Sequence, residues 1–193
     1  MSTIAATRQQ QILDAAARCF ARRGFHRSTM QDICSEAKMS PGSLYRYYTS
    51  KEEIITAMVE RDRVEVLEVL ERIGQYPNLI DALEAETDHL FADVQQPELQ
   101  TLHIEVAAEA LRNPTASAIL QQSNDQYINS LAAIVAEHQR QGAIDTTLNS
   151  TAVAQMLFAI NDGIAFQRAL SPDQDYEPLR QTILILLNRL LRP

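Results

Sequence analysis

Apolar residues recur every three or four positions along almost the whole chain, which is the spacing of one face of an α-helix. No stretch alternates apolar and polar residues between turn dipeptides, and only five of the 193 residues are glycine. Both observations argue against β-strands. The pattern therefore predicts an all-α protein whose helices are separated by short breaks at glycine, proline and asparagine.

Three helices are expected in the first 50 residues. The first spans residues 7–23 and ends at Gly24, because glycine readily adopts the left-handed conformation that terminates a helix. Ser28 is expected to cap the second helix, with Gln31 at the capping-box position. The third helix opens at Ser40, a good N-cap residue, and continues through Tyr48.

A long helix is expected next, from Ser50 to about Gly74, since Ser50 and Glu53 repeat the capping-box spacing. Further helices follow it, each bounded by a proline, glycine or asparagine break. They are expected at about residues 79–94, 97–112, 114–142, 149–171 and 178–191. The last of them carries an apolar stripe so wide that it needs partners on more than one side.

The net charge of −8 hides an uneven distribution. Residues 1–50 carry seven Lys and Arg against three Asp and Glu, a net charge of +4, whereas the rest carries ten against 22, a net charge of −12. A uniformly basic nucleic-acid binder is excluded. The basic N-terminal region nevertheless has the charge to meet an anionic partner.

The second and third helices are separated by only a few residues, which makes them a helix-turn-helix candidate. In that motif the second helix of the pair enters the major groove of DNA with its N-terminus leading. Its early residues face base edges, and the following turn reaches the phosphates. The candidate DNA-binding residues are Ser40, Pro41, Gly42, Ser43, Tyr45, Arg46, Tyr47 and, in the first turn of the next helix, Lys51.

A structural role is the alternative for the three tyrosines in this stretch. Tyr48 lies four residues after Leu44, so it is expected to share the buried side of that residue. For Tyr45 and Tyr47, periodicity alone leaves a core position and a DNA contact equally open.

Residues 12–55 closely resemble the DNA-binding domain of the TetR family of bacterial transcriptional regulators. The matching pieces are Ile12 to Ala16, Phe20, Gly24, Phe25, Thr29, Asp32, Ile33, Ala37, Ser40, Gly42, Leu44, Tyr45, Tyr47, Tyr48, Lys51 and Glu52. The resemblance implies that Tyr48 is a packed aromatic residue. It also implies DNA contacts by Thr29, Ser43, Tyr45, Tyr47 and Lys51.

One departure from the family pattern concerns Lys38, which stands where the family often has glycine in the turn. If this residue adopts left-handed geometry, lysine costs about 1 kcal/mol relative to glycine. We expect the strain to be tolerated, and the ammonium group to be available for one more phosphate contact.

For residues 56–193 the resemblance covers the number and order of helices but few residues. It implies a DNA-binding domain at residues 1–55, followed at 56–193 by an effector-binding and dimerisation domain whose last two helices form a homodimer. The apolar stripe of LRQTILILLNRLL agrees with a dimer, since one side would face the domain core and the other the partner. A monomer that buries this helix centrally is the alternative.

An effector site is hypothesised on the penultimate helix. Phe158, Asp162 and Phe166 recur at i, i+4 and i+8, so two rings flank a carboxylate on one face. That face would fit a cationic aromatic compound, but it would equally fit a dimer seam or a surface ion pair. Asn124 and Tyr127 share an apolar stripe, where they would be polar contacts in a cavity or satisfied polar groups of the core.

Metal binding and catalysis find little support. The four histidines are scattered, and Cys19 and Cys34 lie among apolar residues, where we interpret them as small core residues. The sequence has no nucleophile elbow, phosphate loop or dinucleotide fingerprint, and we expect no cofactor. Glu105 and Glu109 are expected to form a buried pair with Arg112 or with another helix.

No apolar run approaches the roughly 20 residues of a membrane span, and the N-terminus lacks the apolar core of a signal peptide. A cytoplasmic location without membrane contact is therefore expected. The predicted function is that of a homodimeric regulator of transcription, for which a repressor is the preferred hypothesis although the sequence does not separate it from an activator. It would bind a palindromic double-stranded DNA operator and be released by a small-molecule effector. A DNA-binding adaptor for a protein partner is the alternative, and an enzyme with a borrowed helix-turn-helix is a third hypothesis.

Overall fold

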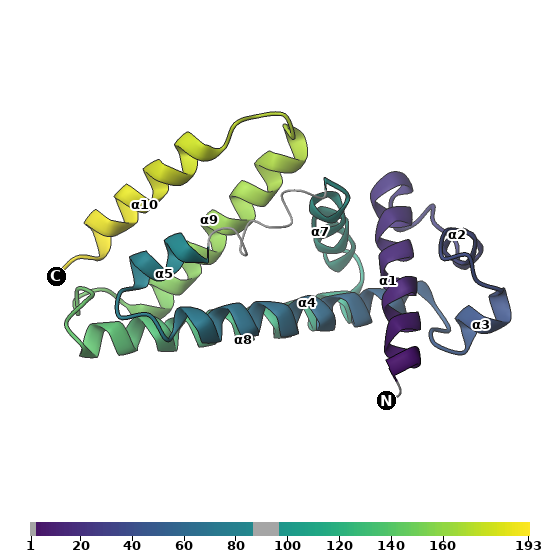
Figure 1. Ribbon diagram of the computed structural model, residues 1–193, viewed down its shortest axis with the longest axis horizontal. Helices are drawn as coiled ribbons and strands as arrows, with labels where there is room; N and C mark the ends of the chain where they lie inside the picture. Colours follow the sequence, from purple (N-terminus) through teal and green to yellow (C-terminus); the bar gives the residue numbers. More distant parts are fainter. Residues whose placement is uncertain (1–2, 87–96) are drawn as a thin grey trace. The chain divides into compact units, whose positions relative to one another are not determined.

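The computed structural model describes residues 3–86 and 97–193. Within these ranges the chain forms helices and no strand, which confirms the all-α prediction (Figure 1). The contacts divide the chain into two compact units, made of Met1–Asp62 with Gln96–Ser123 and of Arg63–Gln95 with Asn124–Pro193. Each unit therefore contains two separate stretches of sequence. The division into domains at residues 1–55 and 56–193 stays a prediction.

The first unit is built around helix α1, and the second around the later helices. In the first unit, α2 and α7 pack against α1, and α3 packs against α2. The bounds of these helices are α1 (Thr3–Arg23), α2 (Met30–Glu36), α3 (Pro41–Tyr45) and α7 (Pro97–Ala110). Two long helices, α4 (Lys51–Ile73) and α8 (Pro114–Arg140), give their first residues to this unit and their later residues to the second.

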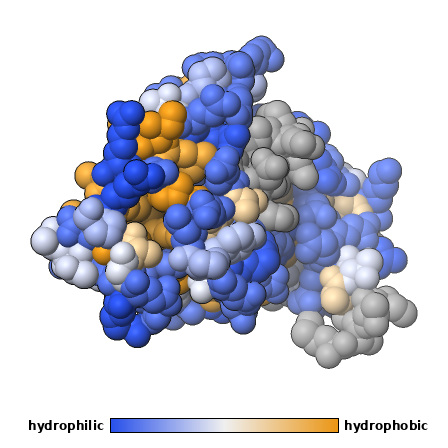
Figure 2. Space-filling model, turned by 60° about the vertical axis from the view of Figure 1, so that its left-hand side comes forward, coloured by the Kyte–Doolittle hydropathy of each residue, from blue (hydrophilic) through white to orange (hydrophobic). Residues whose placement is uncertain are grey.

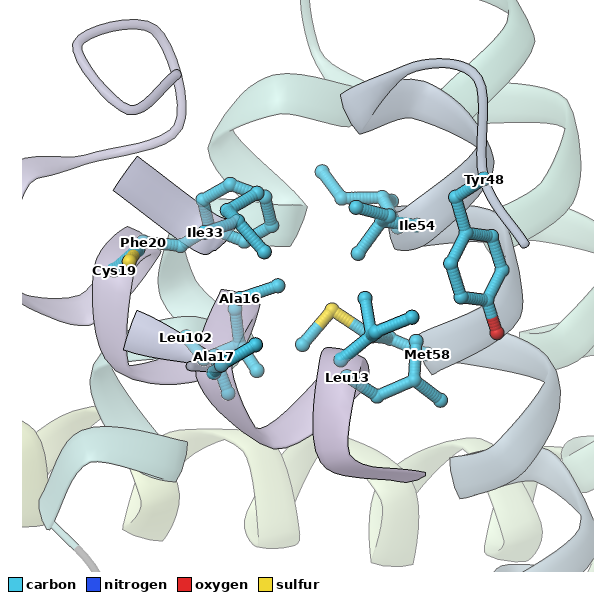
Figure 3. Close-up of a cluster of buried hydrophobic side chains, with 14 of the residues drawn as sticks. Leu13, Ala16, Ala17, Cys19, Phe20, Ile33, Tyr48, Ile54, Met58 and Leu102 are labelled. Atoms are coloured by element: carbon cyan, nitrogen blue, oxygen red, sulfur yellow. The ribbon is translucent and has the colours of Figure 1, made fainter. Parts of the chain in front are cut away.

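A hydrophobic core holds the first unit together (Figure 3). Its fully buried side chains come from α1 to α4 and include Ile12, Phe20, Ile33, Leu44, Ile54 and Met58, and α7 adds Leu102 and Val106, which are nearly as buried. Tyr48 lies at the edge of the same cluster and is buried, which confirms the expected core role. Cys19 and Cys34 are buried as well, and burial raises the pKa of both thiols. They are core residues, as expected, and are protonated at neutral pH.

The cap predicted for α2 was wrong by one residue. Thr29 is the N-cap and Asp32 completes the capping box, in place of the predicted Ser28 and Gln31. The Ser28 hydroxyl is buried and donates to the carbonyl oxygens of Cys19 and Gly24, so α1 captures the group that would have capped α2. The local sequence pattern contains no sign of that long-range partner.

Two other predicted boundaries also differ from the structure. Helix α1 begins at Thr3, four residues before the expected start. Helix α3 ends at Tyr45 instead of Tyr48. The N–H groups of Tyr47 and Tyr48 then both donate to the Leu44 carbonyl, at 2.9 and 3.1 Å, and this turn leads Tyr48 back into the core. The predicted starts at Ser40 and Ser50 are correct, since each hydroxyl accepts the N–H group three residues later.

The second unit combines the later parts of α4 and α8 with α5 (Leu79–Ala85), α9 (Ser150–Leu170) and α10 (Glu177–Leu191). Asn78 and Asn149 cap α5 and α9 through their side-chain oxygens. The core of this unit gathers aliphatic side chains from all five helices, among them Leu70, Ile73, Leu79, Leu131, Val135, Leu157, Leu187 and Leu191. The helix predicted at 79–94 ends at Ala85, and the part of its predicted range from residue 87 onward lies outside the described residues.

Helix α10 has two apolar faces, as its wide stripe predicted. Leu187 and Leu191 are buried in the core of the second unit. In contrast, Ile185, Leu186 and Leu190 are more than half exposed. Figure 2 shows apolar side chains gathered in one area, bordered by hydrophilic residues, on the side of the molecule where α5, α9 and α10 lie in Figure 1. Among the described residues, no helix is both long and apolar enough to cross a membrane.

Lys38 has the left-handed backbone conformation that the sequence suggested, with φ of +51°. Replacing it by glycine removes the steric strain, so we expect Lys38→Gly to raise the free energy of unfolding by about 1 kcal/mol relative to Lys38→Ala. The alanine variant is the matched control, because it also removes the charge but keeps the strain. Urea denaturation of both proteins measures the difference, and equal midpoints would contradict a strained turn.

Candidate functional site

The helix-turn-helix is formed by α2, a tight turn and α3. Ile33 and Cys34 of α2 and Leu44 of α3 are buried in the core of the first unit. The turn between the helices is closed by the N–H group of Met39, which donates to the Cys34 carbonyl at 3.0 Å. These apolar side chains turn one face of each helix toward the core. The opposite face of each helix, and the N-terminus of α3, therefore lie at the surface.

The start of α3 is exposed and sterically open. Ser40 caps the helix, and its hydroxyl accepts the Ser43 N–H group at 3.3 Å. Pro41 and Gly42 are exposed, while Ser43 is half-buried. A Cβ atom added to Gly42 would meet nothing within 4 Å, so packing within the protein does not require glycine at this position.

The three tyrosines after Leu44 have different surroundings. Tyr45 is 49% exposed, and Arg46 beside it is exposed too. Tyr47 is half-buried and packs against the core, so its ring has a structural role while part of it remains accessible. Burial raises the pKa of the Tyr48 phenol. The outward part of this stretch therefore consists of Tyr45, Arg46 and the exposed part of Tyr47.

Lys51 opens α4, but its ammonium group is turned toward the loop between α1 and α2. Its Nζ donates to the carbonyl oxygen of Phe25 at 2.7 Å and lies 4.5 Å from the centre of the Phe25 ring. A second carbonyl, that of His26, is 3.4 Å away. An ammonium group has three donors, so one remains for a phosphate oxygen. Two carboxylates in the first turn of α4 offset the positive partial charge of the helix N-terminus. The positive charge that a phosphate would meet at this site therefore comes from Lys51 itself.

Thr29 has a local structural role that the sequence reasoning did not foresee. Its hydroxyl donates to Asp32 at 2.7 Å and accepts the Asp32 N–H group at 3.1 Å. The same carboxylate accepts the Thr29 N–H group at 2.9 Å. The hydroxyl hydrogen is thus already in use, and Thr29 can donate to a phosphate only by giving up part of the capping box.

Part of the positive charge of the first unit joins α1 to α2. Arg18 and Arg22 both bind the carboxylate of Glu36, the former at 2.7 Å, and Arg23 binds Asp32 at 2.7 Å. These pairs are exposed, and each contributes little to stability. Arg27, Lys38 and Arg46, in and beside the helix-turn-helix, are exposed as well. Sequence reasoning did not single out Arg27, although the charge count pointed to its region.

A pocket lies within the second unit, between α4, α5, α8, α9 and α10. Its volume is about 610 Å³ when the open solvent at its mouth is included. Nine of the residues that line it are aliphatic: Ile73, Leu83, Leu131, Leu157, Ile160, Ile164, Ile183, Leu184 and Leu187. Such a lining favours a ligand that is mostly apolar.

Three polar residues complete the pocket lining, Tyr127, Asn161 and Arg180. Burial, together with the negative charge of Asp162, raises the pKa of Tyr127 to about 12. The phenol is therefore protonated at neutral pH and is a hydrogen-bond donor. Glu177 accepts two hydrogen bonds from the Arg180 guanidinium, at 2.7 and 2.6 Å, so the charge of this arginine is already balanced.

Of the five predicted effector residues, the structure places only Tyr127 in the pocket lining. The ring of Phe158 packs against Tyr127 from behind the lining, with centroids 5.2 Å apart. Asp162 acts on Tyr127 through its charge, Asn124 is half-buried, and Phe166 is 48% exposed. Asn161 and Arg180 were not identified from the sequence. The only sequence signal for these two residues was that each lies beside members of the apolar stripes on the last two helices.

Glu105 and Glu109 do not have the expected partner Arg112. Glu105 accepts the N–H group of Phe25 at 3.1 Å, and Glu109 lies 3.0 Å from the imidazole of His26. Both carboxylates thus reach from α7 to the loop that follows α1. In the described part of the chain, no three His, Cys, Asp or Glu side chains are grouped so as to hold a metal ion.

Fold and site together define a helical protein with a helix-turn-helix at one end of the sequence and an apolar pocket in the remainder, the organisation of a transcriptional regulator. A family model described as "Bacterial regulatory proteins, tetR family" matches residues 12–58, and one described as "BetI-type transcriptional repressor, C-terminal" matches residues 80–192. The chain belongs to the TetR family of transcriptional regulators, as the sequence had indicated.

Similar proteins support this membership over most of the chain. The transcriptional regulator UidR of Escherichia coli K12 is 28% identical over 168 residues, which cover 85% of this chain and 83% of UidR. The nicotine-responsive transcriptional repressor HdnoR of Paenarthrobacter nicotinovorans is 29% identical over 170 residues, 86% of this chain and 85% of HdnoR. The structure of GusR from Salmonella enterica superposes with a TM-score of 0.80 and 29% identity, covering 96% of this chain and 95% of that one.

The capping box at Thr29 generates a test of stability. We expect Thr29→Ala to lower the free energy of unfolding by about 1 kcal/mol at neutral pH, because it removes the cap of α2. Thr29→Ser keeps the hydroxyl and is the matched control, which should stay close to the original protein. Chemical denaturation of the three proteins measures these values.

The same pair of variants has an expected pH dependence. Hydrogen bonds from Thr29, and then the charge of Arg23, lower the pKa of Asp32 in the folded protein. A lowered carboxyl pKa stabilises the fold above the ordinary pKa of about 4, and this stabilisation is lost as the pH falls through the lowered value. The difference in the free energy of unfolding between the original protein and Thr29→Ala should therefore become smaller as the pH falls from about 5 to the pH at which the protein unfolds in acid. A deficit that is constant with pH would show that Asp32 takes no part in the cap.

Proposed function

We propose that this chain is a homodimeric, ligand-responsive repressor that binds a palindromic DNA operator and releases it when a small molecule occupies the pocket of the second unit. The observation that carries the proposal is an apolar pocket lined by five helices in a protein that also has an exposed helix-turn-helix. A repressor is favoured over an activator because the C-terminal family model and HdnoR are both described as repressors.

The DNA-binding residues are proposed to be those that surround the start of α3. Gly42 would let the helix approach the bases closely, and Ser43 would read a base edge. Tyr45 and Arg46 are exposed one turn later, where they would bind phosphates. The complete proposed interface consists of Thr29, Ser40, Pro41, Gly42, Ser43, Tyr45, Arg46, Tyr47 and Lys51.

The dimer interface is proposed to be the exposed apolar face of α9 and α10. Large apolar side chains at this surface are Phe166, Leu170, Leu179, Ile185, Leu186 and Leu190. Monomeric proteins rarely expose so many on two consecutive helices, and a second copy of the same helices would cover them by helix–helix packing. Two recognition helices related by a two-fold axis would then meet half-sites about 34–36 Å apart or somewhat more.

The effector is proposed to be a mostly apolar molecule that carries one hydrogen-bond acceptor. The aliphatic lining provides the contact area, and the Tyr127 phenol and Asn161 amide provide donors. Arg180 is already paired with Glu177, so a strongly anionic ligand would have to compete for it. A relative that responds to nicotine, a small molecule, agrees with this pocket better than with a surface for a protein partner.

Effector and operator would be linked by a coupling free energy. If the liganded protein favours a different separation of the two recognition helices, the ligand weakens operator binding, and the operator weakens ligand binding by the same factor. A coupling of about 1–3 kcal/mol, or roughly 5- to 150-fold, is sufficient for regulation.

Selection of bound duplexes from a random pool tests the operator and the dimer together. The purified protein should enrich a two-fold symmetric motif at near-physiological salt. Leu186→Glu places a charge on the exposed face of α10 and should lower the sedimenting mass to that of a monomer and abolish the symmetric motif. Val64→Glu changes an exposed apolar residue of α4 in the same way and should leave both unchanged. Enrichment of a motif without symmetry would contradict the proposed dimer.

The enriched duplex then serves as the probe for the effector. Compounds that release it should compete with one another, and for a compound that accepts a hydrogen bond Tyr127→Phe should raise the half-effective concentration about tenfold. This variant keeps the ring that packs on Phe158. Tyr76→Phe is the matched control, since Tyr76 lies outside the pocket lining. Equal responses of both variants would remove the Tyr127 hydroxyl from the effector site.

A further inference from the structure

The loop after α1 is held from two opposite directions at a single residue. The N–H group of Phe25 donates to Oε2 of Glu105 on α7, at 3.1 Å. The carbonyl oxygen of the same residue accepts from Nζ of Lys51 on α4, at 2.7 Å. Phe25 thus connects a carboxylate of α7 to the ammonium group proposed to bind a phosphate.

The contact between Lys51 and Phe25 is more than one hydrogen bond. The ammonium group lies 4.5 Å from the centre of the Phe25 ring, which is a cation–π distance. The ring itself is buried and packs edge-on against Phe20 of α1, with centroids 5.3 Å apart. Any displacement of Phe25 therefore moves two of the groups that locate the Lys51 ammonium, and the third is the neighbouring His26 carbonyl.

Glu109 makes a second contact from α7, one helical turn after Glu105. It is buried, and its Oε1 accepts from the Asn113 amide at 3.0 Å. Its Oε2 lies 3.0 Å from Nε2 of His26 but accepts no well-directed hydrogen bond from the described residues. We interpret this contact as one of charge and proximity. The directed hydrogen bond to the loop is the one made by Glu105.

Gly24 precedes Phe25 and lies beside the same carboxylate. It has φ of +76°, which disfavours any residue with a side chain, and it ends α1 as the sequence predicted. A Cβ atom at Gly24 would lie 3.4 Å from Oε2 of Glu105, an ordinary van der Waals distance. Glycine is therefore favoured here by the backbone conformation that leads into Phe25, and not by lack of space.

By sequence, the two ends of this connection belong to different regions. Lys51 falls in the segment matched by the DNA-binding family model, residues 12–58, whereas Glu105 falls in the segment matched by the C-terminal model, residues 80–192. Yet α7 belongs to the first compact unit and packs against α1. A residue of the regulatory sequence region is thus in direct contact with the loop that locates a proposed DNA-binding residue.

We propose that Glu105 is a positioning residue for DNA binding: by holding the Phe25 N–H group it fixes the carbonyl and the ring that place the Lys51 ammonium for its phosphate contact. The inference rests on the proposed function, because it takes Lys51 to be a phosphate ligand. The hydrogen bond from Phe25 to Glu105 is only partly buried, so water could satisfy the N–H group in its absence. The carboxylate is therefore needed for position more than for folding.

If only the charge of Glu105 mattered, its removal would change the affinity for DNA in the opposite direction, and this makes the inference testable. Glu105 is negative, so its removal from a protein of net charge −8 should tighten binding to DNA if charge alone mattered. If Glu105 acts by position, its removal should weaken binding. Glu105→Gln removes the charge and keeps an acceptor oxygen, Glu105→Asp keeps the charge and withdraws the oxygen, and Glu105→Ala removes both.

The experiment measures binding to a random-sequence duplex as a function of salt, so that it does not depend on knowledge of the operator. Lys51→Ala should reduce the slope of log K against log salt by about 0.9 for each phosphate that a subunit no longer neutralises. Glu105→Asp and Glu105→Ala should reduce the slope similarly and lower the affinity about 3- to 10-fold at fixed salt, whereas Glu105→Gln should keep both. Each variant combined with Lys51→Ala should bind no worse than Lys51→Ala alone.

The possible outcomes separate this inference from the proposed function. A reduced slope in Lys51→Ala with an unchanged slope in Glu105→Asp overturns the inference alone and leaves Lys51 as a phosphate ligand. An unchanged slope in Lys51→Ala removes the phosphate contact and the inference with it, while operator selection still decides whether the protein binds DNA. Additive losses in the double variants would also overturn it. Thermal unfolding of each variant shows whether it is folded, and Glu105→Asp keeps the test decisive if Glu105→Ala is not.

Discussion

The first unit depends on the burial of helix α1 on several sides at once. Ala15, Ala16 and Ala17 are consecutive and all buried, and successive residues of a helix point about 100° apart. These three positions alone span more than half of the circumference. Alanine is small enough for α2 and α7 to pack closely on this helix. Without that burial neither the helix-turn-helix nor the carboxylates of α7 would have a fixed place.

Charged side chains of the first unit act mainly on main-chain groups and on one another. Asp32 closes the cap of α2, Glu105 binds the N–H group after α1, and Lys51 binds a carbonyl of the same loop. Such contacts add little stability one by one, but they fix the direction of loops that apolar packing leaves free. The basic side chains of this region thus have two uses, one within the unit and one toward its surroundings.

How far the sequence determined these features depends on the range of the interactions. The starts of α3 and α4 at Ser40 and Ser50 were predicted correctly, because an N-cap involves groups three residues apart. The cap of α2 was predicted one residue early, because Ser28 finds its partners on α1. Tyr48 in the core was predicted from spacing, whereas the family pattern only pointed to Lys38 as a position where a left-handed conformation would cost energy.

The pocket shows the opposite case. Its lining comes from five helices, so which residues face it depends on how each helix is rotated in the packed unit. The sequence drew attention to α9, but the face chosen there, Phe158 to Phe166, is adjacent to the lining residues Asn161 and Ile164 instead of identical with them. Adjacent residues of a helix point in directions about 100° apart, so a shift of one position can move a side chain from the pocket lining to the protein surface.

The placement of α7 has a consequence for the exchange of parts between related proteins. The family models divide the sequence between residues 58 and 80, which invites a chimaera joined there. The compact unit that contains the helix-turn-helix also includes residues 96–123, so such a chimaera would confront the loop after α1 with a foreign helix. The natural module is discontinuous in sequence. A transplant of DNA specificity would have to carry the surface of α7 with it, or re-create a carboxylate opposite Phe25.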